Sequence, residues 1–160
     1  MSNTKWLKLG AVLIGSTATV AVANPAATPG QVFSCSLGAK SILVTASGKS
    51  LVYQYGSVGA PEMTLVGDVN RGNVKYKLET FNHSAETELR FSNGAYSYVL
   101  FSHYSTPDYS GKGAVDRSGL AVFRGSQKLS DKTCRGGKGF SPSYNFDWIP
   151  VYTGDLLDID

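Results

Sequence analysis

The stretch FSNGAYSYVLFSHYS, residues 91–105, predicts the fold of this 160-residue chain. Asn93-Gly94 is a strong signal for a β-hairpin turn, because both residue types tolerate a positive φ. The segment that follows, residues 96–104, is rich in the aromatic residues that strands favour. These features together predict two antiparallel strands joined by a tight turn.

Two segments upstream of the turn alternate in the way expected of a sheet with one face in solvent. Residues 74–81 place apolar side chains on one face and lysine or glutamate on the other. Residues 88–91 repeat the pattern, which predicts that Leu89 and Phe91 point inward and that Glu88 and Arg90 point into solvent.

Glycine-rich turn clusters recur about every ten residues along the rest of the chain. They separate short segments that predict further strands at 32–35, 41–46, 51–55, 63–66, 120–123 and 128–134. No segment after residue 30 shows a sustained helical period. The chain is therefore predicted to be an all-β, single-domain antiparallel sandwich or barrel of about eight or nine strands.

The N-terminal residues have the pattern of a secretory signal peptide. Lys5 and Lys8 make a basic start, an uncharged and mostly apolar run follows, and a small-x-small motif ends at Ala23. The run is shorter and more polar than a membrane span requires, and no cysteine for lipid attachment lies near the cut. We therefore expect a periplasmic or secreted protein in which residues 1–23 are removed, residues 24–30 form a flexible leader, and no membrane anchor is left.

The charge of the chain is nearly balanced overall but uneven along its length. Fifteen Lys and Arg residues against twelve Asp and Glu give +3, and loss of residues 1–23 with two lysines leaves +1. This balance argues against a general nucleic-acid binder. Residues 112–138 carry a local net charge of +5. They form either solvated strand edges, where lysines oppose edge-to-edge pairing, or a basic patch for an acidic partner or an anionic envelope polymer.

Cys35 and Cys134 are the two cysteines of the chain. In an oxidising compartment such a pair is most simply a disulfide, which here would tie the first strand to the last strand of a β-domain at residues 31–134. The alternative is a catalytic or metal-binding thiol pair, but the close CxxC spacing of such sites is missing.

Residues 135–160 are expected to form a C-terminal extension. It begins as a flexible basic loop and continues as an aromatic, acidic segment. Phe146, Trp148 and Ile149 are candidates to pack this segment on the outside of the β-domain.

The chain has few residues of the types that form active sites. His83 and His103 are its histidines, and neither an HExxH motif nor a Gly-x-Ser-x-Gly elbow occurs. Asp155, Asp158 and Asp160 lack the defined loop that a calcium site needs. A pair of carboxylates brought together only by folding would leave no motif. We expect a protein that is not an enzyme and has no cofactor or metal.

Both faces of the predicted strand 96–104 are partly apolar. Tyr96, Tyr98 and Tyr104 share one face with Leu100, whereas the other face carries Val99, Phe101 and His103. Strand tyrosines commonly pack across neighbouring strands, but tyrosine also suits interfaces because it combines a large rigid area with a polar tip. One face is therefore either exposed or covered by the C-terminal segment or by a second subunit, as in a homodimer.

Four segments carry a resemblance to known proteins: FSCSLGAKSILV, LVYQYGSVGAPEMTL, LRFSNGAYSYVLF and SGLAVFRGSQKLSDKTC. Together they resemble a group of small exported bacterial proteins, most of which have no assigned role, over about residues 33–134. The chain is also similar in size, export signal, strand pattern and cysteine pair to the periplasmic lysozyme inhibitors, which are all-β proteins. Those inhibitors insert a Ser-Gly-x-Tyr-like loop into the lysozyme cleft. Its counterpart here is the segment from Ser92 to Tyr96, with Asn93 in place of the serine.

The resemblance implies a protein partner, a lysozyme, whose cleft is plugged by the hairpin tip. Tyr96 would supply buried area, and polar groups near Asn93 would bond the catalytic carboxylates. The residues implied in partner binding are Ser92, Asn93, Gly94, Tyr96 and Tyr98. The alternative function is an envelope interaction or structural protein that holds another subunit or an anionic wall polymer, through Tyr98 and Tyr104 or through the basic segment.

Overall fold

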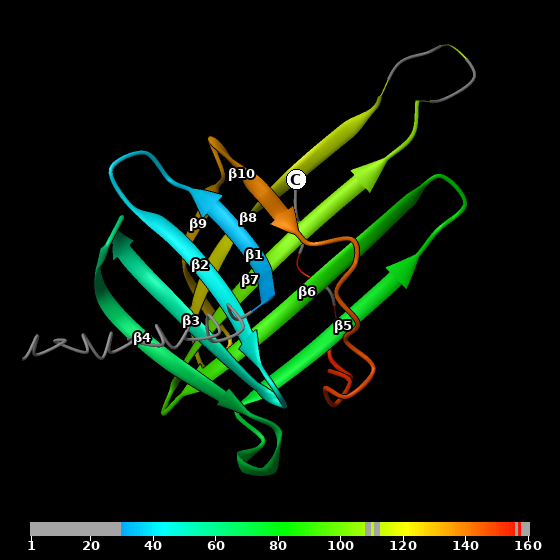
Figure 1. Ribbon diagram of the computed structural model, residues 1–160. Helices are drawn as coiled ribbons and strands as arrows, with labels where there is room; N and C mark the ends of the chain where they lie inside the picture. Colours follow the sequence, from blue (N-terminus) through cyan, green and yellow to red (C-terminus); the bar gives the residue numbers. More distant parts are fainter. Residues whose placement is uncertain (1–29, 108–109, 111–112, 156, 158–160) are drawn as a thin grey trace, which may run out of the picture.

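The computed structural model describes residues 30–107, 110, 113–155 and 157. These residues form two antiparallel five-stranded sheets, and the strands of the two sheets cross one another in Figure 1. The predicted all-β sandwich is therefore confirmed, with ten strands among the described residues rather than eight or nine. The predicted signal peptide and residues 24–29 of the leader lie outside the described residues.

Except for β10, the strands lie where the sequence predicted them, although β6 and β8 begin four and five residues earlier than expected. Sheet A contains β1 (Gly30–Ser36), β2 (Ser41–Ser47), β3 (Ser50–Ser57), β4 (Ala60–Asp68) and β10 (Gly136–Phe140). Sheet B contains β5 (Val74–Thr80), β6 (Ser84–Asn93), β7 (Tyr96–Ser105), β8 (Val115–Arg124) and β9 (Gln127–Thr133). A short 3-10 helix, η1 (Val69–Arg71), connects the two sheets.

Each strand pairs with the next one along the chain, except where the chain crosses between sheets. The first crossing runs from β4 to β5 through η1, and the Asn73 side chain secures it by bonding the Asp68 N–H and the Val66 carbonyl. The second crossing runs from β9 to β10, which then pairs with β1. The last strand therefore lies beside the first strand and forms one edge of sheet A.

Strand β10 was not predicted, because its sequence GGKGF reads as a flexible loop. It pairs antiparallel with β1, with Phe140 opposite Phe33. Gly137 has φ +110°, and a side chain there would collide with the backbone of Ser34 and Cys35. Glycine is therefore required for this close approach, and the same glycines hide the strand from a pattern based on side chains.

The core lies between the two sheets and is rich in aromatic residues. The Tyr53 ring of β3 lies 5.4 Å from Phe91 of β6 and 5.9 Å from Tyr98 of β7, measured between ring centroids. Tyr53 and Phe91 are fully buried. These contacts join β3 of sheet A to β6 and β7 of sheet B, so they hold the sheets face to face.

The C-terminal segment packs into the core, which corrects the expectation that it would lie on the outside of the domain. Phe146 and Ile149 are buried, and Trp148 packs against the same cluster. The Phe146 ring stacks on Tyr76 of β5 at 4.4 Å and meets Phe140 of β10 at 5.6 Å. Phe146 therefore bridges the two sheets, filling space that neither sheet fills with its own side chains.

The central part of the outer face of sheet B is buried as well, so the expectation that Glu88 lies in solvent is wrong. Glu88, Val99 and Phe101 all point outward, yet each is at most 2% exposed. The segment after Pro150 runs beside β5, where the Tyr76 N–H bonds the Pro150 carbonyl and the Tyr152 N–H bonds the Tyr76 carbonyl (Figure 1). It then crosses the outer face, with the Tyr152 ring 4.2 Å from the Arg90 guanidinium.

The predicted disulfide is confirmed between Cys35 of β1 and Cys134, the residue directly after β9. It joins sheet A to sheet B at the second crossing. The two cysteines are 99 residues apart in the chain, so the bond closes almost the whole β-domain into one loop.

Replacing both cysteines, in Cys35→Ser/Cys134→Ser, should lower the free energy of unfolding by about 2–4 kcal/mol, because the long loop gains freedom in the unfolded chain. Urea unfolding followed by tyrosine and tryptophan fluorescence measures this loss. Wild-type protein in dithiothreitol should unfold at the same urea concentration as the variant. Equal stability of the oxidised wild type and the variant would show that the disulfide does not hold the crossing.

Candidate functional site

The β6–β7 hairpin has its turn one residue later than the sequence indicated. Asn93 pairs with Tyr96, so the loop consists of Gly94 and Ala95. Gly94 has φ +58°, and among the described residues only glycines have a positive φ. Asn93 therefore has a negative φ, although asparagine tolerates a positive one. The loop has the glycine-first arrangement of a type II′ turn, which matches the twist of the paired strands.

The tip of this hairpin is exposed and held in place from the side. Asn93, Gly94 and Ala95 are exposed, and Tyr96 is 39% exposed. The Ala95 carbonyl accepts a hydrogen bond from the N–H of Gly125, at 2.9 Å, in the neighbouring β8–β9 turn. Two adjacent turns therefore support each other, and the tip is a preformed surface.

A cation stands next to the exposed tyrosine of the tip. Arg124 lies opposite Tyr96 in the β7–β8 register, and its guanidinium carbon is 6.0 Å from the centre of the Tyr96 ring. At this distance the positive charge interacts with the face of the ring. The tip therefore presents an aromatic ring and a positive charge side by side.

The predicted partner-binding residues do not all reach this surface. Ser92, Asn93, Gly94 and Tyr96 lie together at the tip, where the Ser92 N–H bonds the Asn73 carbonyl. Tyr98 instead points between the sheets and packs against Tyr53. Its side chain belongs to the core rather than to the tip.

The basic segment 112–138 does not form one patch. Arg124 lies at the tip, whereas Lys128 and Lys132 lie on the edge strand β9, where Lys128 forms an ion pair with Asp131 at 3.4 Å. Arg135 directly follows the disulfide residue Cys134, and Lys138 lies within β10. Lys112 lies outside the described residues. Only a small part of this charge is therefore available to a partner that meets the tip.

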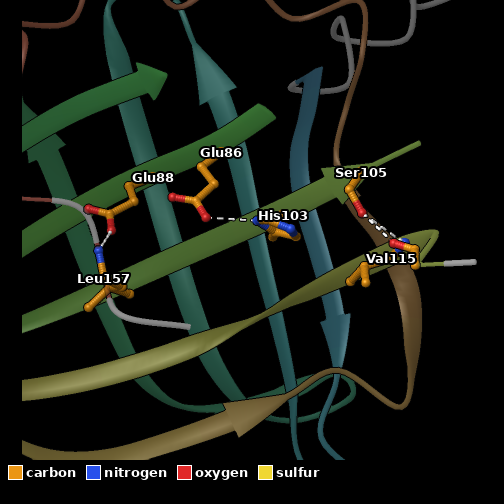
Figure 2. Close-up of polar contacts among 7 residues, drawn as sticks. Glu86, Glu88, His103, Ser105, Val115 and Leu157 are labelled. Atoms are coloured by element: carbon orange, nitrogen blue, oxygen red, sulfur yellow. Dashed lines mark hydrogen bonds and ion pairs between the residues drawn. The ribbon is translucent and has the colours of Figure 1, made fainter. Parts of the chain in front are cut away.

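A second polar cluster lies on the outer face of sheet B and was not predicted. Figure 2 shows Glu86 and Glu88 side by side on β6, with Glu86 directed at His103 and Glu88 at the backbone of Leu157. Glu86 Oε1 lies 2.7 Å from His103 Nδ1, and Glu88 Oε1 accepts a hydrogen bond from the Leu157 N–H at 2.5 Å. The alternation of residues along β6 predicts which side chains share this face. It does not predict that the C-terminal segment covers the face.

Charges of both signs surround the buried Glu88. Arg90 Nη2 lies 3.9 Å from Glu88 Oε2, and that oxygen has no hydrogen-bond partner among the described residues. Lys77 faces the same cluster, where it pairs with Glu79 and donates to the Gly154 carbonyl at 2.6 Å. Burial raises the pKa of the Glu88 carboxyl above its ordinary value, opposed by the Leu157 hydrogen bond, Arg90 and Lys77 and assisted by Glu86.

Among the described residues no group of three or more His, Cys, Asp or Glu side chains is arranged to hold a metal ion. Asp158 and Asp160 lie outside the described part of the chain. In that part, no helix has the length and apolar character needed to cross a membrane.

No protein-family model matches the chain, and neither a curated protein nor a solved structure matches it. Function is therefore inferred from the side chains themselves.

Glu88→Gln should stabilise the protein at pH 7, because glutamine keeps an oxygen for the Leu157 N–H and removes the buried charge. A carboxyl whose pKa is raised by folding binds a proton more tightly in the folded state. Wild-type stability is therefore lost as pH rises from the unfolded value of about 4.3 through the raised folded pKa. The Glu88→Gln variant should lose less stability than the wild type over this pH range. Thermal unfolding between pH 4 and 8 measures both effects.

The matched control is Glu62→Gln, since Glu62 forms an ion pair with Lys40 on the surface and its side chain is 52% exposed. Its stability should follow that of the wild type at every pH. Destabilisation by Glu88→Gln at pH 7 would instead mean that Glu88 acts as a stabilising ion-pair partner of Arg90.

Proposed function

We propose that this is an exported, non-enzymatic binding protein that inhibits a lysozyme-type glycan hydrolase by inserting the β6–β7 tip into the enzyme cleft. The observation that carries the proposal is the exposed, laterally braced tip, in which Tyr96 stands beside Arg124. The partner-contacting residues are Ser92, Asn93, Gly94 and Tyr96, joined by Arg124.

The rigidity of the tip favours an inhibitory role. Its loop has two residues, both of its strands are paired with a further strand, and Gly125 bonds it from the side. A loop that is already ordered loses little conformational freedom on binding, so more of the contact energy appears as affinity. Tyrosine side chains add large buried area at low entropic cost.

The chemistry of the tip also suits the cleft of a glycan hydrolase. Such clefts contain two carboxyl groups that flank the scissile bond. Residues 91–98 and 121–128 contain Arg124 and Lys128 but no Asp or Glu, so the two turns carry no charge that would repel these carboxylates. The Asn93 amide and the Tyr96 hydroxyl are hydrogen-bond donors at the exposed surface.

The neighbouring carboxylates Glu86 and Glu88 are poorly placed for catalysis. Glu88 is 2% exposed and accepts the Leu157 N–H, while Glu86 is engaged by His103. Both lie on the face that the C-terminal segment crosses (Figure 2). A binding role is therefore favoured over hydrolysis at this cluster.

A second candidate function has support from the opposite end of sheet B. Leu78, Phe81 and Tyr104 are each at least 51% exposed there. Exposed apolar side chains of this kind suit contact with another subunit, as in an envelope interaction or structural protein. A dimer in size-exclusion chromatography without lysozyme inhibition would favour this function.

Tyr96→Ala should weaken inhibition about 10- to 100-fold, the loss typical of a central tyrosine at an interface. Lysis of bacterial cell walls by chicken-, goose- and invertebrate-type lysozymes, with and without the mature protein, measures this effect. Tyr104→Ala is the matched control, because Tyr104 is an exposed tyrosine at the other end of β7. Its inhibition should equal that of the wild type.

Two outcomes would contradict the proposal. Failure of the wild-type protein to slow any of the three lysozyme classes would exclude inhibition of these enzymes. An equal loss from Tyr96→Ala and Tyr104→Ala would exclude the tip as the contact surface.

A further inference from the structure

The side chain of Asn73, which directly precedes β5, closes part of the free edge of sheet A. Strand β4 forms this edge, so its backbone groups that point away from β3 have no neighbouring strand among the described residues. Asn73 Oδ1 accepts the Asp68 N–H at 2.8 Å, and Asn73 Nδ2 donates to the Val66 carbonyl at 2.9 Å. The amide therefore takes the place of a neighbouring strand. It can do so because it offers an acceptor and a donor together, whereas a carboxylate offers acceptors alone.

The main chain of the same residue holds the base of the tip. The Ser92 N–H donates to the Asn73 carbonyl at 2.8 Å. Ser92 directly precedes Asn93, which closes the hairpin loop by pairing with Tyr96. Asn73 therefore connects the edge of sheet A, through its side chain, to the tip of sheet B, through its carbonyl.

Packing beneath these hydrogen bonds fixes the same corner of the molecule. Phe91, the residue before Ser92, is buried. Gly67 of β4 has no side chain, and a Cβ atom there would collide with the Phe91 ring. The backbone of β4 therefore lies directly against Phe91. This contact and the Asn73 hydrogen bond act on consecutive residues at the base of the tip.

The two supports of the tip fix different things. The Gly125 N–H bonds the Ala95 carbonyl from the β8–β9 turn, so this support lies within sheet B. The Asn73 bonds lie on the other side of the hairpin, next to β5, and lead to sheet A. The first support joins two turns of one sheet, whereas the second fixes the direction of the tip relative to the other sheet.

From these contacts we infer that Asn73 is a positioning residue of the tip. It acts through Ser92 and holds Asn93 and Tyr96 in the direction that partner binding requires. This role rests on the proposed function, because it concerns the affinity of the same tip. A mobile tip loses more conformational freedom when it binds, so loss of the Asn73 support weakens affinity without removing a contact to the partner.

Asn73→Ala removes both side-chain bonds and keeps the carbonyl that accepts the Ser92 N–H. NMR order parameters of the backbone amides of residues 93–95 measure its effect in the free protein. They should be about 0.85 in the wild type and should fall toward about 0.6, the value of a flexible backbone, in the variant. Inhibition of a lysozyme that the wild type inhibits should weaken about five- to tenfold, the effect of one lost hydrogen-bonded support.

Two further variants separate positioning from a general loss of stability. Cys35→Ser/Cys134→Ser is less stable because of a change at the second crossing, and its tip order and inhibition should equal those of the wild type. Asn73→Asp keeps an acceptor for the Asp68 N–H, but its ionised carboxylate has no donor for the Val66 carbonyl. Its tip should be mobile at pH 7 and regain order below about pH 4, where the carboxyl gains a proton that it can donate. The wild-type tip should be ordered at both pH values.

The role of Asn73 is overturned if Asn73→Ala leaves the order parameters of residues 93–95 unchanged, or if the cysteine variant lowers them as much. It is also overturned if Asn73→Ala loosens the tip and still inhibits a lysozyme as strongly as the wild type does. If the wild type inhibits no lysozyme while Asn73→Ala loosens the tip, the proposed inhibition fails and the support of the tip by Asn73 stands.

Discussion

The packing of Tyr53 against Phe91 and Tyr98 is the interaction on which the rest of the structure depends. It connects β3 of sheet A to β6 and β7 of sheet B, and both Tyr53 and Phe91 are fully buried in it. Because β6 and β7 are anchored there, their shared turn projects beyond the core as a supported tip rather than as a free loop.

The C-terminal segment covers apolar side chains that the packing of the two sheets alone would leave exposed. Strand β7 has apolar side chains on both faces, and a sandwich covers only one face of each sheet. In the C-terminal segment, Phe146 is buried at the edge of the core. The segment then crosses the outer face of sheet B, where Tyr152 covers Arg90 and the Leu157 N–H bonds Glu88. This cover leaves the Glu88 carboxylate only 2% exposed. Arg90, at 3.9 Å, compensates only in part for the solvation that this carboxylate loses.

The sequence predicts most of the fold because alternation and turn chemistry are local signals. The disulfide follows from cysteine number and the predicted compartment, and the tip from an Asn-Gly pair between two strands. The pairing of Tyr96 with Arg124 depends on the β7–β8 register, which no local pattern encodes. Strand β10 and the burial of Glu88 depend on segments distant in the chain, so a period-two pattern detects neither. Tyr98 lies two residues before Leu100 on the same strand, so the alternation predicts that both side chains face the core. The resemblance to lysozyme inhibitors instead implies a contact role for Tyr98.

Mapping of the contact surface by NMR tests the central claim most directly. Adding an inhibited lysozyme to isotope-labelled protein should shift or broaden the backbone amides of residues 92–97 and 124–127, the two turns that support each other. Amides around Tyr104 and Val115, at the far end of β7 and β8, should stay unchanged. Changes confined to that far end would contradict the assignment of the β6–β7 tip as the binding surface.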